Sequence, residues 1–124
     1  MDPRSFVLRG GIFPEAEHVL TAVTDSYEDG DGAVASVYVG LQGEDEEFED
    51  AVKRVSLLAA LPHGRIRVAL AGDLLDAGFE IVQDTSDGQP SCHHNVVFTE
   101  PPQMSQAMLF LECFGPPIAN PAKD

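Results

Sequence analysis

The chain has few basic residues for its length. Seven Lys and Arg residues stand against 21 Asp and Glu residues among 124, so the formal net charge is −14. Proteins bind nucleic acid by replacing condensed counterions with Lys and Arg side chains, and anionic membranes attract the same cations. The composition therefore argues against both nucleic acid and a membrane surface as partners.

Long apolar stretches are also missing. No segment approaches the roughly 20 apolar residues that cross a bilayer. Residues 1–9 contain three consecutive apolar residues, too few for the core of a signal peptide. The two cysteines, Cys92 and Cys113, do not make a disulfide framework. We therefore expect a cytoplasmic protein with both thiols reduced.

The sequence contains neither of the common glycine-rich phosphate-binding patterns, G-x-G-x-x-G and G-x-x-x-x-G-K-[ST]. Gly10 and Gly11 precede a predicted helix, whose N-terminal amides could hold an anion. Glu15 and Glu17 at the start of that helix would repel phosphate, and Arg9 is the base that lies nearby. We expect no phosphate site at this helix and no cofactor.

Apolar residues at a spacing of three to four predict three helices. The first covers residues 16–27, after a favourable Pro14, and the second covers residues 45–61. The third follows the proline pair at residues 101–102, with Met104, Ala107, Met108 and Leu111 on its apolar face. Each helix is followed within a few residues by glycine, which is typical of a helix end.

Apolar residues at a spacing of two predict strands. The pattern is clearest over residues 33–41, where both faces carry apolar side chains, as in a central strand. Residues 79–82 and 92–98 alternate in the same way on either side of a polar loop, which favours an antiparallel pair. A short strand is expected at residues 6–8.

The segment at residues 65–77 fits two periods. Ile66, Val68 and Leu70 alternate as in a strand, but apolar residues also recur at helical spacing through the segment. Gly78 suits the left-handed position after a helix, and Phe79 is the apolar residue that often follows it. This end signal favours a helix, and the strand remains open.

This order of elements predicts one α+β domain over residues 1–124. A chain of this length can bury a single core without metal or disulfide support, and 44% of its residues are hydrophobic. We expect a two-layer sandwich, with about four mostly antiparallel strands and three to four helices on one face.

The negative charge is unevenly placed, because no Lys or Arg lies between Arg9 and Lys53. One interpretation is a coat of carboxylates that keeps the protein soluble. The other is an acidic surface for a basic protein partner, as in an inhibitor, an immunity or antitoxin-like protein, or an accessory subunit. The residues predicted to bind that partner are Glu44, Glu46, Glu47, Asp50, Asp29 and Asp31. The oligomeric state stays open.

An alternative hypothesis is a small enzyme that uses the segment Cys92-His93-His94-Asn95. A catalytic cysteine needs thiolate character, which a nearby cation or a helix N-terminus supplies and a net charge of −14 opposes. The same segment with Cys113 offers zinc ligands, but adjacent strand residues point to opposite faces and no ligands are paired in sequence. We therefore expect no metal site and favour a non-enzymatic protein.

One structural observation would separate the two hypotheses. Convergence of His93 or His94 with a carboxylate and Arg65 or Arg67 in one apolar-lined cleft would favour the enzyme. Histidines scattered beside an acidic surface would favour the interaction module.

Overall fold

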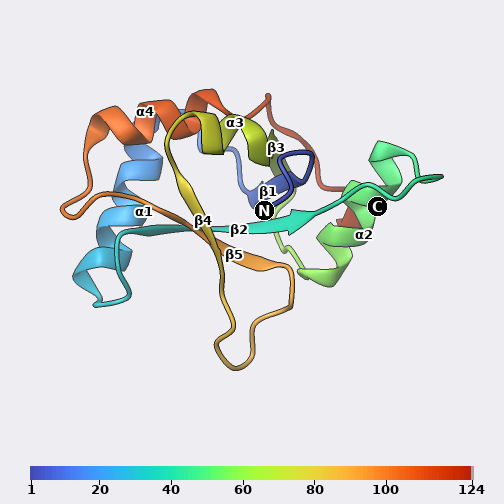
Figure 1. The fold of residues 1–124 in the computed structure, drawn as a ribbon, viewed down its shortest axis with the longest axis horizontal. Coiled ribbons are helices and arrows are strands. Elements are labelled where there is room, and N and C mark those ends of the chain that lie inside the picture. Colours follow the sequence, from blue (N-terminus) through green and yellow to red (C-terminus); the bar gives the residue numbers. More distant parts are fainter. Residues whose placement is uncertain (124) are drawn as a thin grey trace.

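The computed structural model describes residues 1–123 as a single antiparallel sheet with α-helices packed against it (Figure 1). In chain order the elements are β1 (Phe6–Gly10), α1 (Ala16–Glu28), β2 (Val34–Gly40), α2 (Phe48–Leu58), β3 (Arg65–Leu70), α3 (Ala71–Asp76), β4 (Glu80–Gln83), β5 (His93–Val97), α4 (Met104–Glu112), β6 (Ile118–Ala119) and the 3₁₀-helix η1 (Pro121–Lys123). Within the described residues the strands follow the order β4-β5-β2-β1-β3-β6, and all pairs are antiparallel. The predicted α+β fold with mostly antiparallel strands is confirmed.

Strand β1 lies at the centre of the sheet. It pairs with β2 on one side and with β3 on the other, so that Leu8 lies between Tyr38 and Val68. Phe6, Val7 and Leu8 each expose 1% or less of their surface. Because successive side chains of a strand point to opposite faces, both faces of the sheet must be covered at β1.

The helices accordingly lie on both faces. Val7 belongs to the larger core cluster, which helices α1, α3 and α4 cover. Phe6 and Leu8 belong to a second cluster, which is covered by Val52 and Val55 of α2. The predicted two-layer sandwich with its helices on one face is therefore correct for α1, α3 and α4, and α2 adds a partial third layer.

The sheet also has two strands more than the predicted four. The segment at residues 65–77 is divided, with β3 at Arg65–Leu70 and the short α3 at Ala71–Asp76. The prediction of one helix was wrong for the first half, because pairing with the free edge of β1 overrides the local helical pattern. The second missed strand is β6, which is two residues long and pairs with β3.

Helix ends agree with the sequence where glycine defines them. Gly78 has a φ of +95°, and its amide and that of Phe79 bond back to α3, as the end signal predicted. The predicted apolar face of α4 is less accurate, because Met104 and Met108 are exposed while Phe110 fills the core.

No helix in the described part of the chain is long and apolar enough to cross a membrane.

A buried arginine joins three segments of the fold. Arg67 of β3 is 9% exposed and donates hydrogen bonds to the carbonyl oxygens of Phe13 (3.1 Å), Phe114 (3.3 Å) and Gly115 (2.7 Å). Its guanidinium also lies 4.9 Å from the centre of the Phe13 ring. These contacts hold the β1–α1 and α4–β6 connections against β3.

Helix α2 packs closely against the sheet at Gly40, and this position supplies a test of the packing. A Cβ atom there would overlap Val55 Cγ2 and lie 2.8 Å from Phe6 Cζ. We expect Gly40→Ala to lower the free energy of unfolding by about 1–3 kcal/mol, because α2 would have to shift. Gly64→Ala is the matched control, since nothing lies within 4 Å of its Cβ position. Urea denaturation measures both, and equal stabilities would contradict the packing of α2 against β2.

Candidate functional site

The acidic residues predicted to bind a partner do not form one surface. Asp29 and Asp31 lie in the turn after α1, before β2 begins. Glu44, Glu47 and Asp50 lie after β2 ends, in the connection to α2 and its first turn. Strand β2 has seven residues and so spans roughly 20 Å. The two acidic groups therefore occupy opposite ends of the long axis of the molecule (Figure 1).

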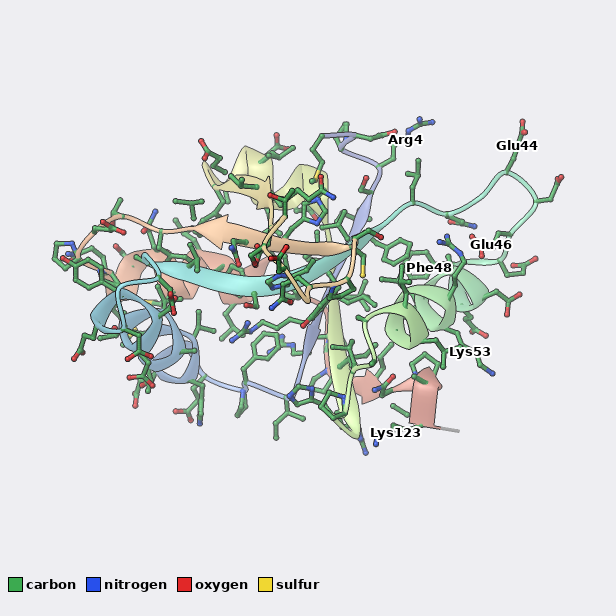
Figure 2. The ribbon with its side chains drawn as sticks, turned by 90° about the horizontal axis from the view of Figure 1, so that it is seen from below. Arg4, Glu44, Glu46, Phe48, Lys53 and Lys123 are labelled. Atoms are coloured by element: carbon green, nitrogen blue, oxygen red, sulfur yellow. The ribbon has the colours of Figure 1, made fainter. Side chains whose placement is uncertain are left out.

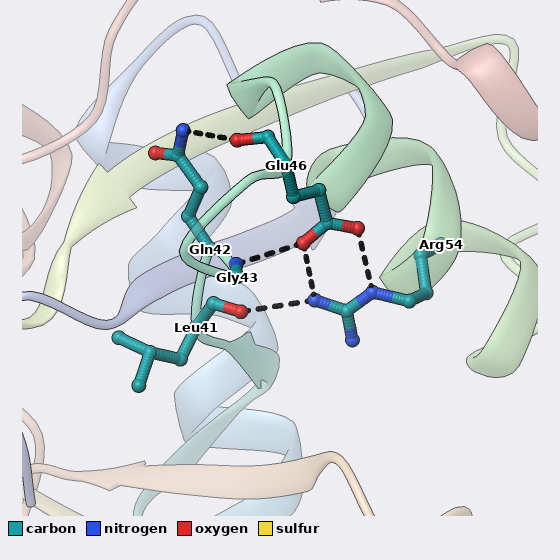
Figure 3. A network of polar contacts seen from close by, with 5 residues as sticks. All are labelled: Leu41, Gln42, Gly43, Glu46 and Arg54. Atoms are coloured by element: carbon teal, nitrogen blue, oxygen red, sulfur yellow. Dashed lines mark hydrogen bonds and ion pairs between the residues drawn. The ribbon is translucent and has the colours of Figure 1, made fainter.

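The carboxylate of Glu46 is held by contacts within the fold. Its Oε2 accepts from Arg54 Nε at 3.0 Å, and its Oε1 accepts from Arg54 Nη2 at 3.0 Å and from the Gly43 amide at 2.9 Å (Figure 3). Arg54 Nη2 also donates to the carbonyl oxygen of Leu41 at 2.9 Å. The hydrogen bond from Arg54 lowers the pKa of Glu46 to about 2. Glu46 thus shapes the β2–α2 connection.

The other carboxylates of this connection are exposed and unpaired. We call Glu44, Asp45, Glu47, Glu49 and Asp50 the α2 acidic cluster. None of the five takes part in an ion pair with another residue of the described chain. Two of them, Glu49 and Asp50, lie in the first turn of α2, where the helix dipole favours negative charge. Figure 2 shows the side chain of Glu44 pointing away from the molecule at the tip of the loop.

An apolar groove opens beside the α2 acidic cluster, between α2 and the end of the chain. Its volume is about 320 Å³, and its lining residues are Phe48, Glu49, Val52, Ile118, Ala119 and Pro121. Phe48 is 40% exposed and Ile118 is 42% exposed, although Phe48 also packs edge-on against Phe6 with ring centres 5.4 Å apart. The groove was missed from the sequence because β6, which contributes Ile118 and Ala119 to its lining, was not predicted.

The cysteines of the alternative hypothesis have surroundings that disfavour a thiolate. Cys92 is buried in the core cluster under α2, and burial raises the pKa of its thiol. Burial also raises the pKa of Cys113, with smaller contributions from the carboxylates of Asp73 and Glu112. Neither thiol has the activation that a nucleophile requires.

The two histidines of this segment are separated by the sheet. His93 is 5% exposed, and its Nδ1 lies 2.8 Å from Asp84 Oδ2 without the alignment of a hydrogen bond. His94, which points to the other face, has its Nδ1 2.8 Å from the carbonyl oxygen of Cys92. The predicted pattern of opposite faces is therefore correct, and it leaves His93 with Asp84 as the one histidine–carboxylate pair within residues 1–123.

His93 and Asp84 line a polar pocket of about 440 Å³. The remaining lining residues are Ser26, Asp31, Val34, Ser36, Ser86, Gln89 and Asn95. Arg65 and Arg67 are not among them, and the lining is polar, so the convergence that would favour an enzyme is met only in part. No group of three or more potential metal ligands is found among the described residues.

Comparisons with protein-family models, curated proteins and solved structures give no match for this chain. Function must therefore be argued from the sites themselves. Two features of the described chain stand out: the apolar groove beside the α2 acidic cluster, and the polar pocket that contains His93. The first combines exposed apolar surface with unpaired charge, and the second has a histidine–carboxylate pair without an activated nucleophile.

The Glu46–Arg54 pair predicts a distinct pH dependence of stability. Because folding lowers the pKa of Glu46 from 4.5 to about 2, the pair stabilises the fold above pH 4.5, and this contribution is lost as the pH falls toward 2. We expect Glu46→Gln to be less stable than the parent protein at pH 7, with the difference shrinking to near zero at about pH 2. Glu47→Gln, at an exposed and unpaired position, should show no such trend. Urea denaturation across this pH range measures the effect, and a pH-independent difference would contradict it.

Proposed function

We propose that this protein is a non-enzymatic interaction module that binds a basic protein partner through the α2 acidic cluster and the adjoining apolar groove. An inhibitor, an immunity or antitoxin-like protein, or an accessory subunit of a larger complex would each use such a surface. The observation that carries the proposal is the exposure of Phe48 in the lining of the groove, next to the exposed carboxylates of Glu47 and Glu49.

The chemistry of this surface suits a specific protein contact. Binding energy at interfaces is concentrated in a few apolar and aromatic anchors that lose water, while charges at the rim act on encounter and orientation. Phe48 and Ile118 supply such anchors, and Glu49 of the α2 acidic cluster lies beside them in the groove lining. Lys53 and Lys123 lie on the other side of α2, away from Glu44 (Figure 2). The bound segment should therefore place its basic residues toward Glu44 and its apolar residues in the groove.

Asp29 and Asp31 are not part of this surface, because β2 separates them from it. Glu46 supports the surface indirectly by fixing the loop that carries Glu44. The proposed binding residues are thus Glu44, Glu47 and Asp50 from the predicted set, together with the exposed Phe48.

A small enzyme acting at His93 is the second candidate, and the Asp84–His93 pair favours it. A general base of this kind needs a hydrogen bond that orients the imidazole and a nucleophile or substrate proton within reach. The pair is close but poorly aligned, and Cys92 faces the core instead of the polar pocket. For these reasons we favour the interaction module over the small enzyme.

Charge variants test the proposal against a partner that is isolated by affinity capture and then purified. We expect the triple variant Glu44→Gln, Glu47→Gln, Asp50→Asn to slow association roughly tenfold and to weaken its salt dependence, because rim charges steer the encounter. The matched control, Glu28→Gln, Asp29→Asn, Asp31→Asn, removes the same charge at the other end of the molecule and should change association little. Surface plasmon resonance at several salt concentrations measures both, and equal effects would contradict a localised acidic site.

Truncation of the anchor tests the groove separately. Phe48→Ala should weaken binding by about 2 kcal/mol or more, mainly through faster dissociation, because an interface anchor would be lost. Leu58→Ala, which truncates a 52% exposed residue on the same helix, should leave binding unchanged. His93→Gln with His94→Gln should also have no effect. Binding that survives Phe48→Ala in a folded protein and is lost with the histidine variant would contradict the proposal and favour the second candidate.

A further inference from the structure

Arg9 of β1 is a half-buried cation that has no carboxylate partner among residues 1–123. Its Nη1 donates to the carbonyl oxygen of Ser36 at 2.8 Å, and its Nε is buried without a hydrogen-bond acceptor. The ion pairs of residues 1–123 lie elsewhere in the molecule. Burial lowers the pKa of Arg9, because the charged form loses contact with water. This lack of a partner is unusual in a chain with three acidic residues for each basic one.

Arg67, which neighbours Arg9, is a useful comparison because its contacts are purely structural. It lies opposite Arg9 in the β1–β3 register, and both guanidinium groups approach the ring of Phe13. Arg67, however, donates to several backbone carbonyls and is almost fully buried. Arg9 donates to one carbonyl and lines a pocket instead.

Other residues with hydrogen-bond donors line the same pocket as Arg9. Its volume is about 260 Å³, and its wall includes Tyr38, Ser36 and His63. The ring of His63 lies directly against Gly10, where a Cβ atom would overlap Nδ1. Glycine at this position therefore allows the imidazole to take its place in the wall. No aspartate or glutamate is among the lining residues.

We propose that this pocket binds the oxyanion group, phosphate or carboxylate, of a small molecule. A guanidinium offers several N–H donors in a plane that matches such groups, and partial burial strengthens the charge-assisted hydrogen bonds. The hydroxyl of Tyr38 and the imidazole of His63 supply additional donors. The polar pocket that contains Asn95 and His93 adjoins this one at Ser36 and would take the polar remainder of the molecule.

The proposed site differs from the phosphate site that the sequence argued against. That site would use the N-terminal amides of α1, where Glu15 and Glu17 oppose an anion. Here the donors are side chains from β1, β2 and the α2–β3 connection, which the fold brings together. The site is also independent of the partner surface proposed above, which uses α2 and β6.

Titration with inorganic phosphate and with acetate, in chloride buffer at constant ionic strength, tests the proposal. We expect saturable NMR shifts of the backbone amides of Arg9, Ser36, Tyr38 and His63, and a rise in the melting temperature with the anion that binds. Comparison of the two anions shows whether phosphate or carboxylate is preferred. Absence of saturable shifts at these residues with either anion would overturn the proposal.

Variants assign the binding to the pocket. Arg9→Gln should weaken binding about tenfold or more, because it removes the charged donor. Arg65→Gln is the matched control, an exposed arginine on β3 outside the pocket, and should change nothing. If Arg9→Gln does not fold, Tyr38→Phe retains the ring and should still weaken binding several-fold, and Gly10→Ala should do so by displacing His63. Equal losses in Arg65→Gln and the pocket variants would overturn the assignment.

Discussion

Burial of β1 on both faces is the constraint on which the rest of the fold depends. Phe6, Val7 and Leu8 are almost completely buried, and a strand of alternating side chains achieves this only when both faces of the sheet are covered. Helices α1, α3 and α4 cover one face. Helix α2 covers the other, and Gly40 allows it to approach closely. The position of α2 then decides where the acidic cluster and the apolar groove lie.

The coverage by α2 is incomplete, and this leaves room for polar sites. A helix of 11 residues covers the sheet over β1 and β3 but leaves β2, β4 and β5 open beyond Tyr38. In the uncovered part, Ser36 is exposed, and it joins the pocket of His93 to the pocket of Arg9. The pocket of His93 and the pocket of Arg9 thus both arise because α2 is too short to cover the whole face of the sheet.

Three arginines, Arg67, Arg54 and Arg9, show how a strongly acidic chain uses its few cations. Arg67 satisfies carbonyl oxygens where the chain leaves the sheet, since a buried polar group is costly when it lacks a partner. Arg54 holds the β2–α2 connection through Glu46. Within the described part of the chain Arg9 has no carboxylate partner, although the sequence contains many acidic residues. Its position is explained by packing on Phe13 and by the pocket it lines.

The sequence by itself determined the features that depend on neighbouring residues. These are the apolar face of α1, the end of α3 at Gly78 and the opposite directions of His93 and His94. The net charge follows from the composition alone. Only the tertiary structure decided whether residues 65–70 form a strand, which carboxylates are free, and which side chains meet in a pocket. Periodicity and capping act over a few residues, whereas strand pairing and ion-pair partners depend on segments distant in the chain.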